Sequence, residues 1–93
     1  MARKKSRKKK KKPANLIGPQ VQKLRYTLGL TQEKFAARCQ IKGLDISRGT
    51  LSQIEAQLRR VTDFELLLLS QILRVPTDTL FPKGTKRPKS KSL

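Results

Sequence analysis

Residues 29–55, GLTQEKFAARCQIKGLDISRGTLSQIE, decide the fold of this chain. Two helix starts lie within the stretch, because the hydroxyls of Thr31 and Ser47 can each accept a hydrogen bond from a free backbone N–H in the turn that follows. Apolar residues come after each start at helical spacing. In the first helix, the residues that line up on one inward face are Phe35, Ala36 and Cys39. The stretch therefore predicts two short amphipathic helices.

The second of these helices is expected to present a thin polar face to its surroundings. Leu51 and Ile54 form its buried stripe, with Leu58 as a candidate for the next position. Arginine and glutamine can make paired hydrogen bonds to base edges in the DNA major groove, and glycine lets a backbone come close. We therefore expect base contacts from the four residues of the outer face, which are Arg48, Gly49, Ser52 and Gln53.

The order of several runs resembles the Cro and phage-repressor type of helix-turn-helix, the XRE-like family. The runs are LRYTLGL (24–30), GLTQEKFA (29–36), ISRGTLSQIE (46–55) and VTDFELLLLSQIL (61–73). The resemblance covers about residues 17–81 and implies an all-α, lambda-repressor-like bundle of about five short helices. One departure is visible, since residues 40–45 lengthen the family's tight turn of about 3–4 residues by about four more. The angle between the two helices is therefore not fixed by the resemblance.

The resemblance also assigns roles to individual residues. An arginine in the first helix pairs with a glutamate late in the third helix of the family, and Arg25 and Glu55 stand at these places. The loop after the third helix lies against the DNA backbone, where arginines can grip phosphates with two donors. The residues expected near the backbone are Gln32, Thr50, Arg59 and Arg60. The implied function is sequence-specific binding of double-stranded DNA by a small transcriptional regulator of bacterial or phage type.

The remaining helices have their own sequence signals. Gly18 and Pro19 open the first helix, which ends at Gly29. Its apolar stripe consists of Val21, Leu24 and Leu28. Thr62 and Glu65 have the spacing of a capping box and predict the start of a fourth helix.

The fourth helix is apolar on more than one side. Leu66 or Leu69 could therefore contact a partner subunit in a homodimer, although a small bundle could also cover all four leucines of the run 66–69 internally. Pro76 ends this helix, and residues 77–81 predict a short fifth helix whose Leu80 and Phe81 close the core.

The formal charge of +17 over 93 residues is concentrated at the two ends of the chain. Residues 1–15 and 82–93 hold nine and five Lys/Arg and no acid, whereas residues 16–81 carry a net charge of only +3. We expect two disordered basic tails around one domain, and a polyanionic partner such as nucleic acid. The cations of the N-terminal arm are Arg3, Lys4, Lys5, Arg7, Lys8, Lys9, Lys10, Lys11 and Lys12.

Composition argues against several other classes. The chain has no histidine and a single cysteine, Cys39, so we expect no metal site, no disulfide, no cofactor and no catalytic residues. No apolar run approaches the ~18 residues that a membrane span needs. We expect a cytoplasmic, nucleoid-associated protein rather than an enzyme or a membrane protein.

Two alternative functions fit the same composition. A sequence-tolerant protein bound to RNA or the ribosome would use mainly its lysine tails. An antitoxin-type module would dock a protein partner, with the fourth helix as its surface. Competition between one selected duplex and bulk nucleic acid separates the first alternative from a specific reader, and co-purification with a neighbouring gene product tests the second.

Overall fold

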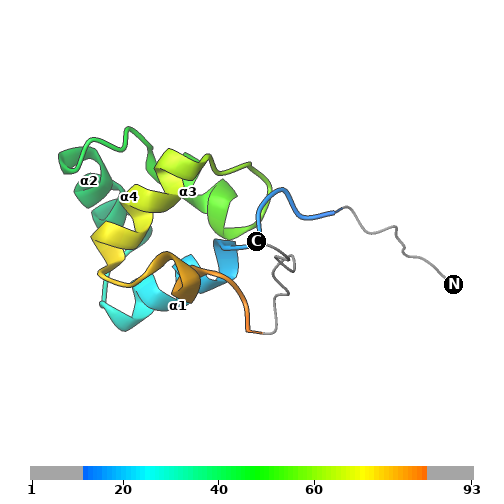
Figure 1. Ribbon diagram of the computed structural model, residues 1–93. Helices are drawn as coiled ribbons and strands as arrows, with labels where there is room; N and C mark the ends of the chain where they lie inside the picture. The colour runs from blue at the N-terminus through cyan, green and yellow to red at the C-terminus, as the bar shows by residue number, and fades with distance from the viewer. Residues whose placement is uncertain (1–11, 84–93) are drawn as a thin grey trace, which may run out of the picture.

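A computed structural model describes residues 12–83, and every regular element within this range is a helix. The elements are α1 (Gly18–Thr27), α2 (Gln32–Ile41), α3 (Arg48–Glu55), α4 (Asp63–Leu73) and a short 3-10 helix, η2 (Thr77–Leu80). Figure 1 shows the four α-helices gathered into one bundle, with the N-terminal segment leaving beside α3. The predicted all-α architecture is confirmed, and its fifth element is a single 3-10 turn. None of the described helices is long and apolar enough to cross a bilayer.

Hydroxyl side chains begin three of the four α-helices. The N–H of Lys34 donates to Oγ1 of Thr31, and the N–H of Thr50 donates to Oγ of Ser47, both at 3.1 Å. At the start of α4, Thr62 and Glu65 exchange side-chain and backbone hydrogen bonds in a complete capping box. These contacts satisfy N–H groups that a helix start leaves without a partner. The helix starts predicted at Thr31, Ser47 and Thr62 are confirmed.

All four α-helices end in the same way, with one residue in the left-handed region. The hydrogen bonds of a Schellman motif accompany each of these ends, so each helix closes its last turn before the chain changes direction. Glycine adopts this conformation freely, whereas a residue with a Cβ is held there by its surroundings. The four residues are Gly29, Gly43, Gln57 and Arg74.

The lengthened connection between α2 and α3 is packed into the core. Leu44 and Ile46 are only 5% and 3% exposed. The N–H of Leu44 donates to the carbonyl of Cys39 at 2.8 Å, and Nε2 of Gln40 donates to the carbonyl of Ile46 at 2.9 Å. Two buried side chains and two hydrogen bonds thus set the position of α3 against α2, which the resemblance alone left open.

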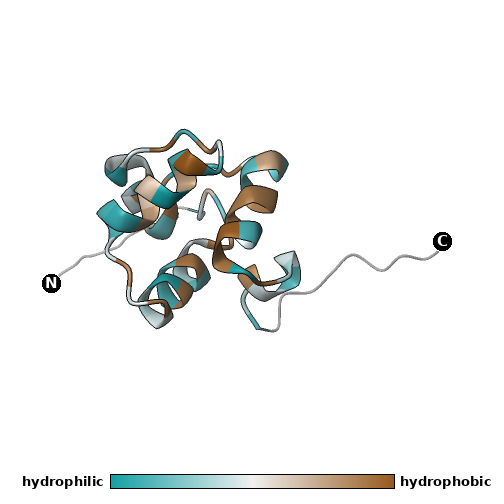
Figure 2. Ribbon diagram, turned by 90° about the vertical axis from the view of Figure 1, so that its left-hand side faces the viewer, coloured by the Kyte–Doolittle hydropathy of each residue, from teal (hydrophilic) through white to brown (hydrophobic). Residues whose placement is uncertain are grey.

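The core lies between the four α-helices and is closed by η2. Its fully buried side chains include Val21, Phe35, Cys39, Leu51, Ile54, Leu69 and Leu80. Figure 2 shows apolar segments (brown) turned toward the middle of the bundle and polar ones (teal) at its outside. Burial raises the pKa of the Cys39 thiol to about 12, so this group stays protonated and acts as a small apolar side chain.

Three apolar residues differ from the prediction. Leu58 is 72% exposed, because α3 ends at Glu55 and the helical spacing that placed Leu58 on the buried stripe no longer applies. Leu28 is 44% exposed, since it follows the last helical residue of α1. Leu69 is fully buried and is therefore not available to a partner subunit. The exposed apolar residues of α4 are instead Phe64 and Leu67.

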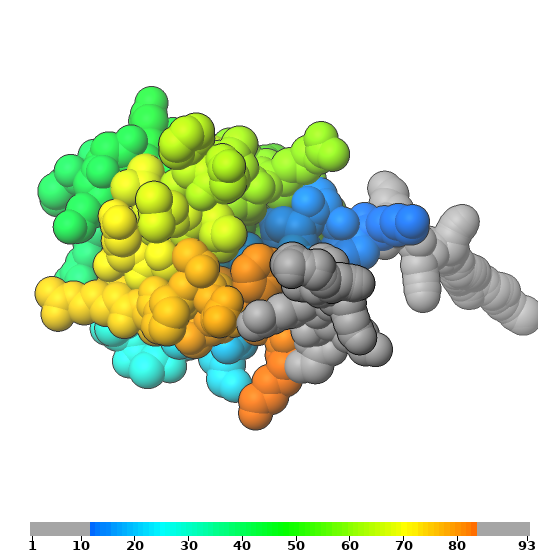
Figure 3. Space-filling model, in the orientation of Figure 1, coloured from blue at the N-terminus to red at the C-terminus, as the bar shows by residue number. Residues whose placement is uncertain are grey.

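The segment before α1 is tied to the end of α3. The N–H of Ala14 donates to the carbonyl of Gln57 at 2.9 Å. Nδ2 of Asn15 donates to the carbonyls of Ile54 and Arg59, and its Oδ1 accepts from the N–H of Gly18. Ala14 and Asn15, the last residues of the predicted arm (1–15), are therefore hydrogen-bonded to the folded body. Figure 3 shows this N-terminal segment (blue) leaving the body on the right-hand side, far from the ends of α2 (green) and α4 (yellow).

Most of the predicted basic arm (1–11) and most of the predicted C-terminal tail (84–93) lie outside the described residues.

Candidate nucleic-acid interface

Helix α3 has one buried face and one exposed polar face. Leu51 and Ile54 are completely buried against the other helices. The four residues predicted to read bases, Arg48, Gly49, Ser52 and Gln53, are all exposed. Because the apolar residues fix the rotation of α3 about its axis, the polar residues are presented outward as one surface. We call these four residues the reading face.

The fold does not require a glycine at position 49 of the reading face. A Cβ built at this position would approach Oγ of Ser47 at 3.7 Å, which is an ordinary contact, and its backbone is helical. Gly18 is different, since a Cβ there would overlap the carbonyl oxygen of Ile54. The packing of α1 on α3 therefore explains Gly18, whereas Gly49 leaves room for a backbone approach from outside.

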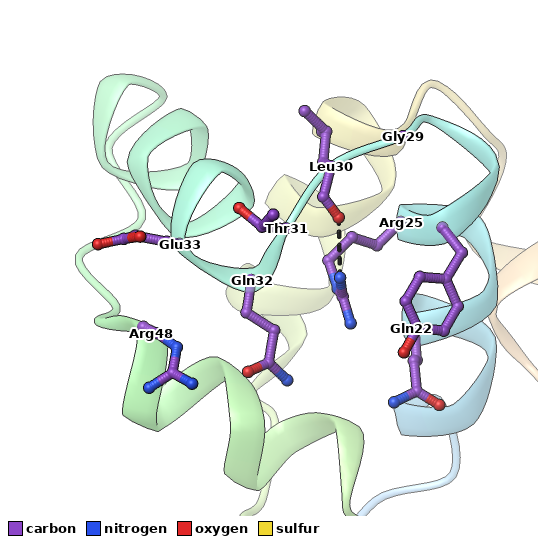
Figure 4. A pocket seen from close by; sticks show the side chains of 9 residues that line it. Gln22, Arg25, Gly29, Leu30, Thr31, Gln32, Glu33 and Arg48 are labelled. Atoms are coloured by element: carbon purple, nitrogen blue, oxygen red, sulfur yellow. Dashed lines mark hydrogen bonds between the residues drawn. The ribbon is translucent and has the colours of Figure 1, made fainter.

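An open cleft of about 590 Å³ lies next to the reading face, where the end of α1 and the starts of α2 and α3 converge. Its lining residues are Gln22, Arg25, Tyr26, Gly29, Leu30, Thr31, Gln32, Glu33 and Arg48. Figure 4 shows Gln32 extending between Arg48 from α3 and Gln22 from α1, whereas Glu33 points away from Gln22. The cleft thus joins the first residue of the reading face to polar side chains of two other helices.

A buried ion pair supports the floor of this cleft. Nε and Nη2 of Arg25 donate to Oε2 and Oε1 of Glu55 at 2.7 and 2.9 Å, and the two side chains are only 4% and 2% exposed. Nη1 of Arg25 also donates to the carbonyl of Leu30 at 2.8 Å. The hydrogen bonds to Glu55 raise the pKa of Arg25 above its ordinary value, so the guanidinium stays charged. The structure brings together the two residues that the resemblance paired.

Gln32 takes part in the same network, although the sequence predicted only that it contacts the DNA backbone. Its Nε2 donates to Oε1 of Glu55 at 2.9 Å. One amide hydrogen is thereby used inside the protein, and the second remains for an external acceptor. The carboxylate of Glu55 thus connects α1, α2 and α3 directly below the cleft.

The start of α2 offers backbone donors at the cleft. The opening N–H groups of a helix have no partner within it, and Thr31 caps only that of Lys34. The N–H groups of Gln32 and Glu33 therefore remain for an external acceptor. A helix start with free donors and a positive dipole end favours an anionic group such as a phosphate.

The two loop arginines differ in their contacts within the protein. Nη1 and Nη2 of Arg59 donate to the two carboxylate oxygens of Glu65, both at 3.0 Å, and Nη1 also donates to the carbonyl of Arg60. Hydrogen bonds from Arg59 are the main cause that lowers the pKa of Glu65. Arg59 therefore fastens the loop to the start of α4, and the phosphate contacts expected of Arg59 and Arg60 stay predictions. Arg60 is exposed.

Thr50 is half-buried at the edge of the reading face. Its hydroxyl accepts from Oγ of Ser47 at 3.2 Å, and its N–H donates to the same Oγ. The Thr50 side chain is thereby held in the cap of α3, next to Arg48 and Gly49.

Two polar residues of the cleft were not predicted from the sequence as site residues. Gln22 and Tyr26 are four residues apart on α1 and flank Arg25, whose Cζ lies 4.6 Å from the centre of the Tyr26 ring. Their spacing could have indicated them, since residues i and i+4 share a helix face and the predicted apolar stripe used the other face. The three hydrogen bonds of the Asn15 side chain were also not predicted from the sequence.

Comparisons with known proteins agree with this geometry. The family model described as helix-turn-helix matches residues 21–80. A solved structure, the restriction-modification controller protein C.AhdI from Aeromonas hydrophila, is similar with a TM-score of 0.59 and 29% sequence identity, over 70% of this chain and 87% of that chain. A comparison with curated proteins found no match. The chain belongs to the helix-turn-helix family, in its XRE-like class of Cro and phage-repressor type. It is a DNA-binding transcription regulator.

Proposed function

We propose that this regulator binds double-stranded DNA sequence-specifically, with α3 in the major groove. The observation that carries the proposal is the division of α3 into a buried stripe and the exposed reading face. Arg48 and Gln53 offer side chains that can make paired hydrogen bonds to guanine and adenine edges. Gly49 adds no side chain that would hold the backbone away from the groove.

The cleft and the loop supply the contacts that orient the protein on the duplex. Phosphate contacts fix register and orientation, whereas base contacts distinguish sequences. Gln32 and the start of α2 receive one phosphate, with Thr50 beside them at the start of α3. Arg60 receives another phosphate from the loop after α3. Arg59 contributes indirectly, because its pairing with Glu65 holds the loop in place.

The basic arm adds affinity without selectivity. Nine Lys/Arg within its first twelve residues can neutralise phosphates and release counterions. The hydrogen bonds of Ala14 and Asn15 place the root of the arm beside the end of α3. The arm therefore starts close to the duplex that α3 reads.

A homodimer through α4 is part of the proposal. Phe64 and Leu67 are 76% and 49% exposed and lie three residues apart on one face of α4. A pair of large exposed apolar side chains on one helical face is suited to an isologous contact. Sedimentation should show a dimer for the native chain and a monomer for Phe64→Ser/Leu67→Ser at the same concentration. A monomeric native chain at micromolar concentration contradicts the dimer but not the reading face.

Selection of duplexes from a random pool tests the proposed function. We expect one recovered site that the chain prefers over bulk DNA by about 10³ or more. A palindromic site would support the dimer, because operator symmetry mirrors protein symmetry. Recovery of no preferred site, together with equal affinity for RNA, would support the sequence-tolerant alternative instead.

A further inference from the structure

A second basic surface lies where α2 and α4 end. A hollow of about 220 Å³ opens between the two helices, and we call it the distal pocket. Its lining residues are Arg38, Ile41, Lys42, Gln71, Ile72 and Arg74. None of them belongs to the reading face or to the cleft. Figure 3 shows the ends of α2 (green) and α4 (yellow) on the left-hand side, opposite the departing N-terminal segment.

The residues that line the distal pocket give it a positive charge that no acidic residue among them balances. Arg38, Lys42 and Arg74 contribute three positive groups, and no carboxylate lines the hollow. Elsewhere in the described residues, Arg25 and Arg59 each have a glutamate partner. Three cations around one small hollow favour an anionic ligand, because their mutual repulsion is relieved when a negative group lies between them.

An exposed apolar residue distinguishes this surface from a simple basic patch. Ile41 is the last residue of α2 and is 84% exposed between Arg38 and Lys42, whereas Ile72 is buried beneath the hollow. The favourable interaction of late cations with the helix dipole accounts for Arg38 and Lys42. It does not account for a β-branched apolar side chain at the rim of the same hollow.

We propose that the distal pocket binds an acidic segment of another protein. One apolar side chain of that segment packs against Ile41, and flanking carboxylates face Arg38, Lys42 and Arg74. The chain's own tails do not match, because residues 1–11 and 84–93 contain no Asp or Glu. A phosphate backbone matches the cations but leaves Ile41 without a partner, so the combined chemistry favours a peptide.

The test uses the full chain, labelled with ¹⁵N, and a short synthetic peptide of Glu, Asp and Leu. A second peptide carries Gln and Asn in place of the acids. We expect the acidic peptide to shift the amide signals of residues 38–42 and 71–74, and the neutral peptide to leave them unchanged. Because the basic tails also attract acids, affinity is compared between variants rather than read from the native chain alone.

Two charge-matched double variants separate the pocket from overall charge. Arg38→Gln/Lys42→Gln should weaken peptide binding about tenfold, and Lys23→Gln/Lys34→Gln about twofold or less, since only the first pair lies in the pocket. Ile41→Ser should weaken binding of the leucine-containing peptide about threefold, with no loss for a peptide in which Ser replaces Leu. Like the native chain, all three variants should bind the specific duplex more tightly than random duplexes.

Three results would overturn the proposal. Equal losses in the two double variants would mean that peptide binding reports only net charge. Pocket shifts with inorganic phosphate or a random duplex that depend equally on Arg38 and Lys42, and not on Ile41, would make the pocket a phosphate site. A lower melting temperature of Arg38→Gln/Lys42→Gln with unchanged peptide affinity would mean that the two cations only stabilise the end of α2 through the helix dipole.

Discussion

Arg25 of α1 and Glu55 of α3 form a two-point ion pair inside the bundle, and Gln32 of α2 donates to the same carboxylate. Glu55→Ala leaves the Arg25 guanidinium buried without its partner, so we expect the free energy of unfolding to fall by about 3–5 kcal/mol. Chemical denaturation at neutral pH measures this. Asp45→Ala, which removes an exposed acid from the α2–α3 connection, should change stability by less than about 0.5 kcal/mol. A Glu55→Ala variant as stable as the native chain would show that the pair does not hold the helices together.

Gly18 and Gly49 offer a matched pair of substitutions. Gly18→Ala forces a Cβ against the carbonyl oxygens of Ile54 and Glu55, and we expect it to destabilise the fold by about 1–3 kcal/mol. Gly49→Ala places a Cβ in open helical space and should leave stability equal or raise it by up to about 1 kcal/mol. Its DNA affinity should nevertheless fall, because the methyl group enters the space reserved for the groove. Full affinity of Gly49→Ala would mean that the backbone does not approach DNA there.

Arg59 and Arg60 are neighbours for which we expect opposite phenotypes. Arg59→Ala breaks the pair with Glu65, which is partly exposed, and should lower stability by about 0.5–1 kcal/mol. Arg60→Ala should keep the melting temperature and make the slope of log K against log salt shallower by about 0.9, the value for one phosphate contact. Thermal unfolding and salt-dependent binding distinguish the two. The reverse pattern would return the phosphate role to Arg59.

Changes in the basic arm should affect DNA binding, whereas changes at Asn15 should affect folding. Deleting residues 1–12 should leave the melting temperature unchanged, because the hydrogen bonds of Ala14 and Asn15 remain. If about four to six of the nine deleted charges meet phosphates, the salt slope should become shallower by about 3–5 units. Asn15→Ala should lower the melting temperature instead, since it strands the carbonyls of Ile54 and Arg59. An unchanged slope after the deletion would exclude the phosphate role of the arm.

The sequence predicted those features that depend on local chemistry. Thr31, Ser47 and Thr62 act through the turn that follows each of them, so their hydroxyls were sufficient to place three helix starts. The inward faces of α2 and α3 followed from spacing within single helices. The pairing of Arg25 with Glu55, 30 residues apart in the chain, came only from the family resemblance.

The features that the sequence did not predict depend on where helices end and on distant contacts. Leu58 was assigned to the buried stripe because the left-handed turn at Gln57 has no glycine to announce it. Arg59 was grouped with Arg60 because its partner Glu65 belongs to the next helix. Asn15 acts on carbonyl groups 39 and 44 residues away, and no spacing pattern records such contacts.

Gln53 is the residue that tests most directly whether α3 reads the DNA sequence. It is exposed on the reading face, and its side chain makes no hydrogen bond to another described residue. The most direct measurement is the affinity of Gln53→Ala for the selected duplex and for random DNA, with Gln20→Ala on α1 as the control. We expect Gln53→Ala to lose about 1–3 kcal/mol on the selected site, to relax the choice at one base pair, and to change little on random DNA. Gln20→Ala should match the native chain on both. Equal losses of Gln53→Ala on the two duplexes would contradict the assignment of α3 as the helix that reads the sequence.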